Sequence, residues 1–220
     1  MSAATIAGLL LIALPLAFNS AFGLLAARFD YPDVLRRPAA EVLAAFRAGG
    51  TSLVLLWWAF ALTAVLLAPA VVLLAAAVPD ADPTLLSVAT TIGVLAAAVQ
   101  FLGLVRWPFL VPHLAASEPS EAVDLVFEAF NRYLGVAVGE HLGYLLTGAW
   151  TTLIGVALTQ TAAVPAWIGI LGIAIGPALM LCSLEFVGRR DGWRAAERLT
   201  PVAYVAWSLW LMATGVALLV

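Results

Sequence analysis

The chain contains no lysine, because all ten of its basic residues are arginines. It therefore cannot form the lysine Schiff base that retinal proteins need, and it cannot use a lysine nucleophile. Cys182 is the only cysteine, which excludes an internal disulfide and a metal site built on a Cys-x-x-Cys motif. The HExxH, GxSxG, phosphate-binding-loop and potassium-filter motifs are also absent, so no motif predicts an enzyme or a potassium channel.

Charge is scarce throughout the sequence. Only 10% of the residues are charged and 64% are hydrophobic, with a mean hydropathy of +1.07. A soluble domain averages about 25% charged and about 45–50% apolar residues, so these residues cannot build a polar surface. The sequence therefore predicts an integral membrane protein whose first partner is the lipid bilayer. A net charge of −3 without a basic tail predicts no nucleic-acid partner. The sequence leaves open whether the protein forms a homo-oligomer.

Charge-poor stretches predict six transmembrane helices in one all-α domain covering residues 1–220, since a spanning helix needs about 20 apolar residues. The predicted spans are approximately residues 3–27, 51–78, 84–116, 133–161, 164–187 and 201–220. Pro108 and Pro112 predict a kink in the third span, because each proline removes a backbone hydrogen bond.

Two segments between the spans are amphipathic. We expect each to form a short helix, either lying in the membrane interface or packed on the bundle. Ser120 precedes acidic residues and predicts the N-cap of the second helix. The apolar faces are Val42, Leu43 and Phe46 in residues 38–48, and Val123, Val126, Phe127 and Phe130 in residues 120–132.

The arginines give the predicted orientation. The loops after the first, third and fifth spans hold nine arginines, and the other loops and both ends hold none. The positive-inside rule then places these three loops in the cytoplasm and both termini outside, and we expect the chain in the plasma (inner) membrane. The nine are Arg28, Arg36, Arg37, Arg47, Arg132, Arg189, Arg190, Arg194 and Arg198.

Polar residues inside the predicted spans mark the candidate site. A charged side chain costs about 2.5–3.5 kcal/mol at a helix centre, so it usually faces the bundle interior and finds a partner. Residues of this kind gather in the cytoplasmic half of the spans, and we expect a cytoplasm-facing polar cavity in which Arg106 pairs with Glu140. The candidate binding residues are Asn19, Arg106, Glu140, His141, Tyr144 and Glu185.

Three functions fit this cluster. In the first, the protein binds or transports a small molecule or ion, with Arg106 attracting an anionic group while Glu140 and His141 exchange protons. In the second, His113 and His141 ligate haem or a metal, although their predicted depths differ by roughly 6–8 Å. In the third, the protein is structural or sensory, and the buried charges only fix helix register.

Four stretches carry a family resemblance. They are FDYPDVLRRP at residues 29–38, RWPFLVP at 106–112, GEHLGY at 139–144, and the segment from Trp193 to Ser208. Together they resemble a bacterial membrane family known as domain of unknown function 4386, over nearly the whole chain. The resemblance implies a multi-helix membrane fold, brings no known activity and assigns no site residue.

Overall fold

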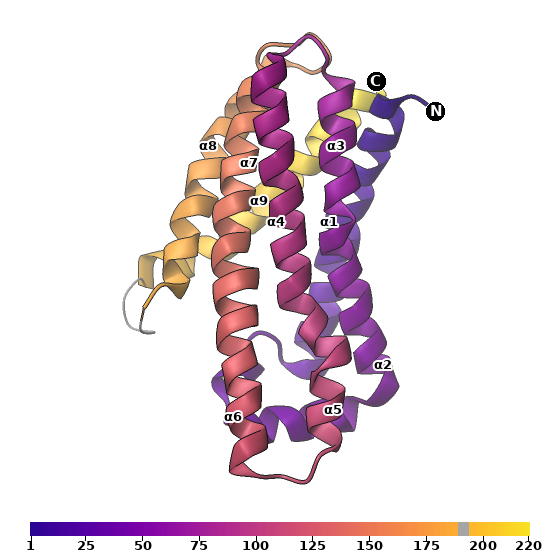
Figure 1. Ribbon diagram of the computed structural model, residues 1–220. Coiled ribbons are helices and arrows are strands. Elements are labelled where there is room, and N and C mark those ends of the chain that lie inside the picture. The colour runs from indigo at the N-terminus through magenta and orange to yellow at the C-terminus, as the bar shows by residue number, and fades with distance from the viewer. Residues whose placement is uncertain (189–193) are drawn as a thin grey trace.

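Long, predominantly apolar runs form the helices that are long enough to span a membrane. Figure 1 shows these helices in a computed structural model. The structure describes residues 1–188 and 194–220, without the side chains of residues 194, 195 and 197. The elements are α1 (Ala3–Phe29), η1 (Asp33–Arg36), α2 (Ala39–Val65), α3 (Leu67–Ala77), α4 (Pro83–Phe109), α5 (Val111–Ala116), α6 (Glu121–Phe130), η2 (Asn131–Leu142), α7 (Gly143–Leu158), α8 (Ala166–Cys182), η3 (Ser183–Phe186) and α9 (Arg194–Leu219).

These elements combine into six helices that are long and apolar enough to cross a membrane. They run over Ala3–Phe29, Ala39–Ala77, Pro83–Ala116, Glu121–Leu158, Ala166–Phe186 and Arg198–Leu219. The prediction of an all-α membrane protein with six spans is therefore confirmed. Arg189 and Arg190, which the orientation argument used, lie outside the described residues, as does the side chain of Arg194.

Prolines and one glycine set the breaks inside the long helices. The helix of the third span is interrupted at Leu110, between Pro108 and Pro112, where α4 ends and α5 begins. In the second span, α2 and α3 meet at Leu66, three residues before Pro69. Gly50 kinks α2 nearer its start, where its φ of 57° is readily available only to glycine.

The two amphipathic segments take different places. Residues 39–49 form the first part of α2, before the Gly50 kink, and their predicted apolar face is buried against the bundle at Val42, Leu43 and Phe46. The second segment is α6, which Ser120 caps by accepting a hydrogen bond from the Val123 N–H. It continues through η2 into α7 as one long helix. Its Phe127 is buried, whereas Val126 and Phe130 face outward.

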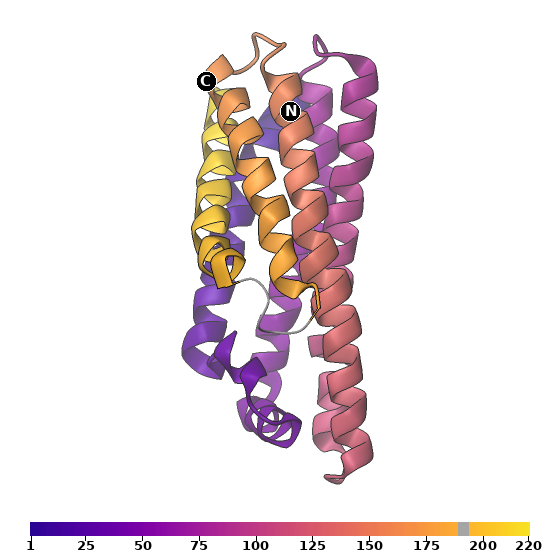
Figure 2. The same ribbon diagram turned by 90° about the vertical axis from the view of Figure 1, so that its left-hand side faces the viewer.

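The bundle has two apolar cores stacked along its length. At the end that holds both termini, α3, α7, α8 and α9 pack with the start of α1 and α4. At the other end, the last turns of α1 pack with α2, α5 and α6 and with Trp107 of α4. Helices α8 and α9 stop short of this second end, which Figure 2 shows from the side. The polar residues of interest lie where the two cores meet.

Candidate functional site

Arg106 is held at the junction of the two cores by its own helix and by η2. Only 7% of the residue is exposed. Its Nη2 donates to Asn131 Oδ1 at 2.8 Å, and its Nη1 donates to the carbonyl of Gly103 one turn earlier. The guanidinium lies 5.3 Å from the centre of the Trp107 ring. Gly135 provides the space, because a Cβ added there would overlap the guanidinium.

Glycines also bring α4 and η2 into close contact. A Cβ on Gly103 would stand 2.5 Å from Gly139 Cα, so the two backbones touch at this point. Arg106 faces Gly135 and Gly103 faces Gly139, which means that the two helices run antiparallel. The segment η2 is a π-helix, a form that is rare and often found at functional sites.

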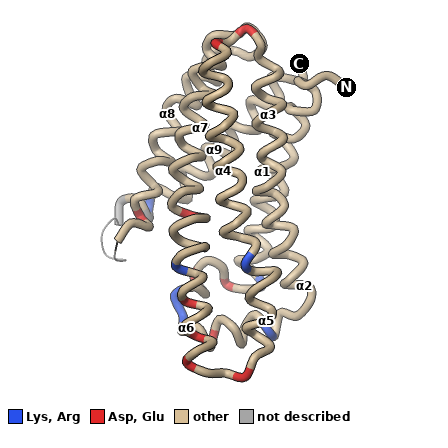
Figure 3. The backbone as a smooth tube through the Cα atoms, viewed as in Figure 1, with Lys and Arg blue, Asp and Glu red and all other residues tan. Residues whose placement is uncertain are grey.

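The predicted ion pair between Arg106 and Glu140 is not present. Both side chains are described, and no oxygen of Glu140 lies within ion-pairing distance of Arg106. The two charges are nevertheless close enough to interact electrostatically. In Figure 3, the acidic and basic residues inside the bundle are few, and most charge gathers at the end away from the termini.

The carboxylate of Glu140 makes no hydrogen bond and no ion pair with any residue that the structure describes. The residue is nonetheless only partly exposed. Its charge lies within electrostatic range of the carboxylate of Glu185. The same holds for the phenol groups of Tyr31, Tyr144 and Tyr204. Glu140 is therefore a carboxylate inside a membrane-spanning helix with no direct protein partner among the described residues.

Tyr144, four residues after Glu140 on the same long helix, begins a row of aromatic contacts. The ring centre of Tyr144 on α7 lies 4.7 Å from that of Tyr204 on α9 and 5.1 Å from that of Phe186 in η3. Tyr204 in turn stacks on Phe18 of α1 at 6.3 Å. None of the phenol hydroxyls of Tyr31, Tyr144 and Tyr204 forms a hydrogen bond within the described part of the chain.

Tyr31 reaches the site from the loop after α1. Asp30 takes a left-handed conformation, with φ at 55°, and turns the chain back on itself, and Arg37 closes the turn by an ion pair with Asp30. The Tyr31 ring packs edge-on against Trp57 with 5.0 Å between centres. Burial raises the pKa of the Tyr31 phenol well above its usual range, and the nearby Glu140 charge adds to this effect.

The remaining candidates lie around this centre but are engaged in hydrogen bonds. His141 Nδ1 lies 3.0 Å from the Ser183 carbonyl, and because a carbonyl can only accept, this nitrogen carries the proton. Glu185 Oε2 accepts from the Thr200 hydroxyl at 2.9 Å. Asn19 donates to the carbonyl of Pro15 at 2.7 Å and to Ser208 Oγ at 3.1 Å.

His113 does not join the cluster. It is exposed on α5, ten residues beyond Gly103, which corresponds to about 15 Å along a helix. His141 lies beyond Gly139 in the opposite direction along the bundle, because η2 and α4 are antiparallel. The two histidines are therefore too far apart to ligate one haem iron or metal ion. Within the described residues, no group of three or more His, Cys, Asp or Glu side chains is placed to hold a metal.

Sequence reasoning missed several members of the site. It did not select Tyr31, Tyr204, Asn131 or Ser208, all of which contact or face the candidates. The spacing of Tyr204 and Ser208, four residues apart on one helical face, was the available signal for the last span. Tyr31 lies in a loop, where helical periodicity gives no information.

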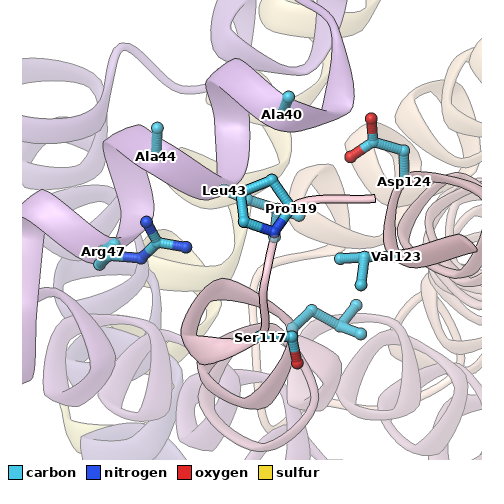
Figure 4. Close-up of a pocket in the computed structure, with 9 residues that line it drawn as sticks. Ala40, Leu43, Ala44, Arg47, Ser117, Pro119, Val123 and Asp124 are labelled. Atoms are coloured by element: carbon cyan, nitrogen blue, oxygen red, sulfur yellow. The ribbon is translucent and has the colours of Figure 1, made fainter. Parts of the chain in front are cut away.

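A separate small pocket opens at the charged end of the bundle (Figure 4). It has an empty volume of about 350 Å³ and lies between the start of α2, the end of α5 and the start of α6. Arg47 and Asp124 are the charged residues at its wall. Arg47 already donates from Nε to the Ala115 carbonyl. The pocket contains none of the predicted site residues.

Comparison with known proteins supports the resemblance seen in the sequence. No curated protein and no solved structure matches the chain. The family described as a domain of unknown function, DUF4386, matches residues 6–215. Since this match covers nearly all of the helical bundle described above, the chain belongs to the DUF4386 family.

Proposed function

We propose that the protein binds a small solute or ion beside Glu140 and carries it across the membrane in exchange for a proton. The observation that carries the proposal is the Glu140 carboxylate, which sits within a membrane-spanning helix without a hydrogen bond or an ion pair to the described residues. A carboxylate inside a membrane-spanning helix is costly unless it is paired, so an unpaired one needs a proton or a ligand. Alternating between the two is the elementary step of proton-linked transport.

Two other pairs of polar side chains inside the spans have a different character. Gln100 donates to Thr147 Oγ1 at 3.0 Å, and Trp207 donates to Thr151 Oγ1 at 2.9 Å. These side chains satisfy one another across α4, α7 and α9, as expected of groups that hold a bundle together. The contrast with Glu140 favours a functional role for this carboxylate over a purely structural one.

The proposed orientation opens the site toward the cytoplasm of a bacterial cell. The arginines of one end lie in or next to η1, in the first part of α2 and near the start of η2, whereas Asp80 and Asp82 lie in the turn between α3 and α4. In Figure 3 the basic residues gather toward the end of the bundle away from the termini. The positive-inside rule places the arginine-rich end in the cytoplasm. Glu140 lies in η2, between α6 at the arginine-rich end of the bundle and α7.

The test uses liposomes that contain the full chain and a trapped pH indicator. Small cations, anions and neutral solutes are added outside in turn, and proton movement is recorded. We expect at least one class of solute to drive proton flux in the wild type. Glu140→Gln should abolish this flux. The matched control is Glu128→Gln, which changes an exposed carboxylate on the same long helix and should keep it.

Two outcomes overturn the proposal. Wild-type liposomes that move no protons with any solute show that the protein is not a proton-linked transporter. Flux that survives in a folded Glu140→Gln variant shows that the proton is carried elsewhere. Circular dichroism and size-exclusion profiles of both variants establish that each one is folded.

A further inference from the structure

We infer that the pocket between α2, α5 and α6 binds the head group of a zwitterionic phospholipid, with the lipid phosphate at Arg47 and a primary ammonium at Asp124. This pocket shares no residue with the Glu140 site, so the inference is independent of the transport proposal. It uses three features of the pocket: two opposite charges that are available, an apolar lining, and a position at the ends of two long helices.

The two charged groups of the pocket are available to a ligand. Arg47 donates from Nε to the Ala115 carbonyl, which ties its side chain to α5. The terminal nitrogens of Arg47 and the carboxylate of Asp124 have no hydrogen-bond or ion-pair partner within the described chain. Figure 4 shows the two side chains on different sides of the pocket. Arg47 is exposed and Asp124 is partly exposed, so a ligand can reach both.

This pair of charges selects a ligand that carries both signs. A purely anionic group is attracted by Arg47 but repelled by Asp124, and a purely cationic group meets the reverse. A phosphate suits Arg47, because a guanidinium donates two parallel hydrogen bonds to it. A primary ammonium suits Asp124, because it donates N–H groups to a carboxylate, whereas a trimethylated ammonium has none to donate.

The position of the pocket favours a lipid as the source of this head group. The pocket residues of α2 lie at the start of a 39-residue apolar helix, and Asp124 lies near the start of a 38-residue one. About 20 residues cross the hydrocarbon core of a bilayer, so each helix extends well beyond it. Glu41 and Arg47 are the only charged residues of the first helix. They mark its beginning as the part at head-group level.

Most of the pocket lining is apolar, which a small soluble zwitterion leaves unused. A lipid places its glycerol backbone and the first methylene groups of its acyl chains directly below the phosphate, where they can contact such a lining. The apolar lining residues are Ala40, Leu43, Ala44, Leu114, Pro119 and Val123.

The experiment measures lipid binding to the full chain in mild detergent by native mass spectrometry. The probes are the dioleoyl forms of phosphatidylethanolamine, phosphatidylcholine and phosphatidylglycerol, which have the same acyl chains. We expect the first molecule of phosphatidylethanolamine to bind about three- to fivefold more tightly than either of the others, which is the effect of one exposed ion pair. Glycerophosphoethanolamine, the same head group without acyl chains, is added in excess as a competitor and should not displace the lipid.

Two variants assign the charges of the head group to the two residues. Arg47→Gln should weaken the binding of all three lipids, because each one carries the phosphate. Asp124→Asn removes the partner of the ammonium and the repulsion of anions, so phosphatidylglycerol should then bind at least as tightly as phosphatidylethanolamine. This gain cannot come from a misfolded protein. The matched controls are Arg28→Gln and Glu128→Gln, which change exposed charges outside the pocket and should keep the wild-type preference.

Three outcomes overturn the inference. Equal binding of phosphatidylethanolamine and phosphatidylcholine to the wild type shows that no ammonium N–H is recognised. A wild-type preference that persists in Asp124→Asn shows that the preferred lipid binds elsewhere. Displacement of the lipid by glycerophosphoethanolamine shows that the pocket takes a soluble zwitterion instead of a membrane lipid.

Discussion

The guanidinium of Arg106 and the carboxylate of Glu140 lie within electrostatic range of each other inside the bundle, yet they form no ion pair. The charge of Arg106 is stabilised locally by the Gly103 carbonyl, the Asn131 amide oxygen and the Trp107 ring. The Glu140 carboxylate has no hydrogen bond or ion pair with the described residues. In a direct ion pair, neither charge would have remained available to a ligand. Because the two groups are separated, the Glu140 carboxylate can still accept a proton or a ligand.

Asn131 in η2 accepts a hydrogen bond from Arg106 of α4, and removing this acceptor should destabilise the protein. Asn131→Ala leaves one buried guanidinium N–H without an acceptor, which costs about 1–3 kcal/mol. Thermal unfolding in detergent should show the loss as a lower Tm. Asn131→Asp is the control, because it restores an acceptor and adds an opposite charge. A Tm that is the same for the Ala and Asp variants would contradict this role.

Gly135 provides a second test of how Arg106 is packed. A methyl group added there would collide with the guanidinium, so Gly135→Ala should cost about 1–3 kcal/mol as an overpacked substitution. Gly23→Ala is the matched control, since a Cβ on this exposed helical glycine meets nothing within 4 Å. The control should be neutral or stabilising by about 0.5–1 kcal/mol, because alanine favours a helix. Equal destabilisation by both substitutions would refute the packing argument.

The fold follows from local properties of the sequence to a large extent. Charge-free runs of about twenty residues are long enough to span the bilayer, and there they form helices because the backbone must make its own hydrogen bonds. Their positions can therefore be read from the sequence. The apolar face at Val42, Leu43 and Phe46 is likewise a consequence of helical periodicity. The interruption of the helix at Leu110 follows from the two prolines around it.

The partner of Arg106 was harder to predict, for a physical reason. Side-chain directions were assigned with 3.6 residues per turn, but η2 is a π-helix with wider turns, so the directions around Glu140 differ from the assumed ones. The register between α4 and η2 is set by the contact of Gly103 with Gly139. Such a contact depends on tertiary packing and leaves no periodic signal.

Tyr31 should ionise only well above the usual range for a phenol. Burial raises its pKa in the folded state above the unfolded value of about 10. The neutral phenol therefore contributes stability that is fully present below about pH 10 and is lost as the pH rises toward the folded pKa. The difference in phenolate absorbance between the wild type and Tyr31→Phe measures this residue alone among the four tyrosines. A difference that titrates with a midpoint near pH 10 in the folded protein would contradict the burial of the phenol.

Membrane orientation can be tested with single cysteines, because Cys182 is the only native one and is buried. In a Cys182→Ala background, Asp80→Cys places an exposed thiol at one end of the bundle and Glu128→Cys places one toward the other end. A membrane-impermeant maleimide applied to intact bacteria should label the first variant and not the second, since the positive-inside rule puts the arginine-rich end inside. Both should react once the membrane is permeabilised, which controls for accessibility. Labelling of the Glu128→Cys variant alone in intact cells would invert the orientation and open the Glu140 site to the outside.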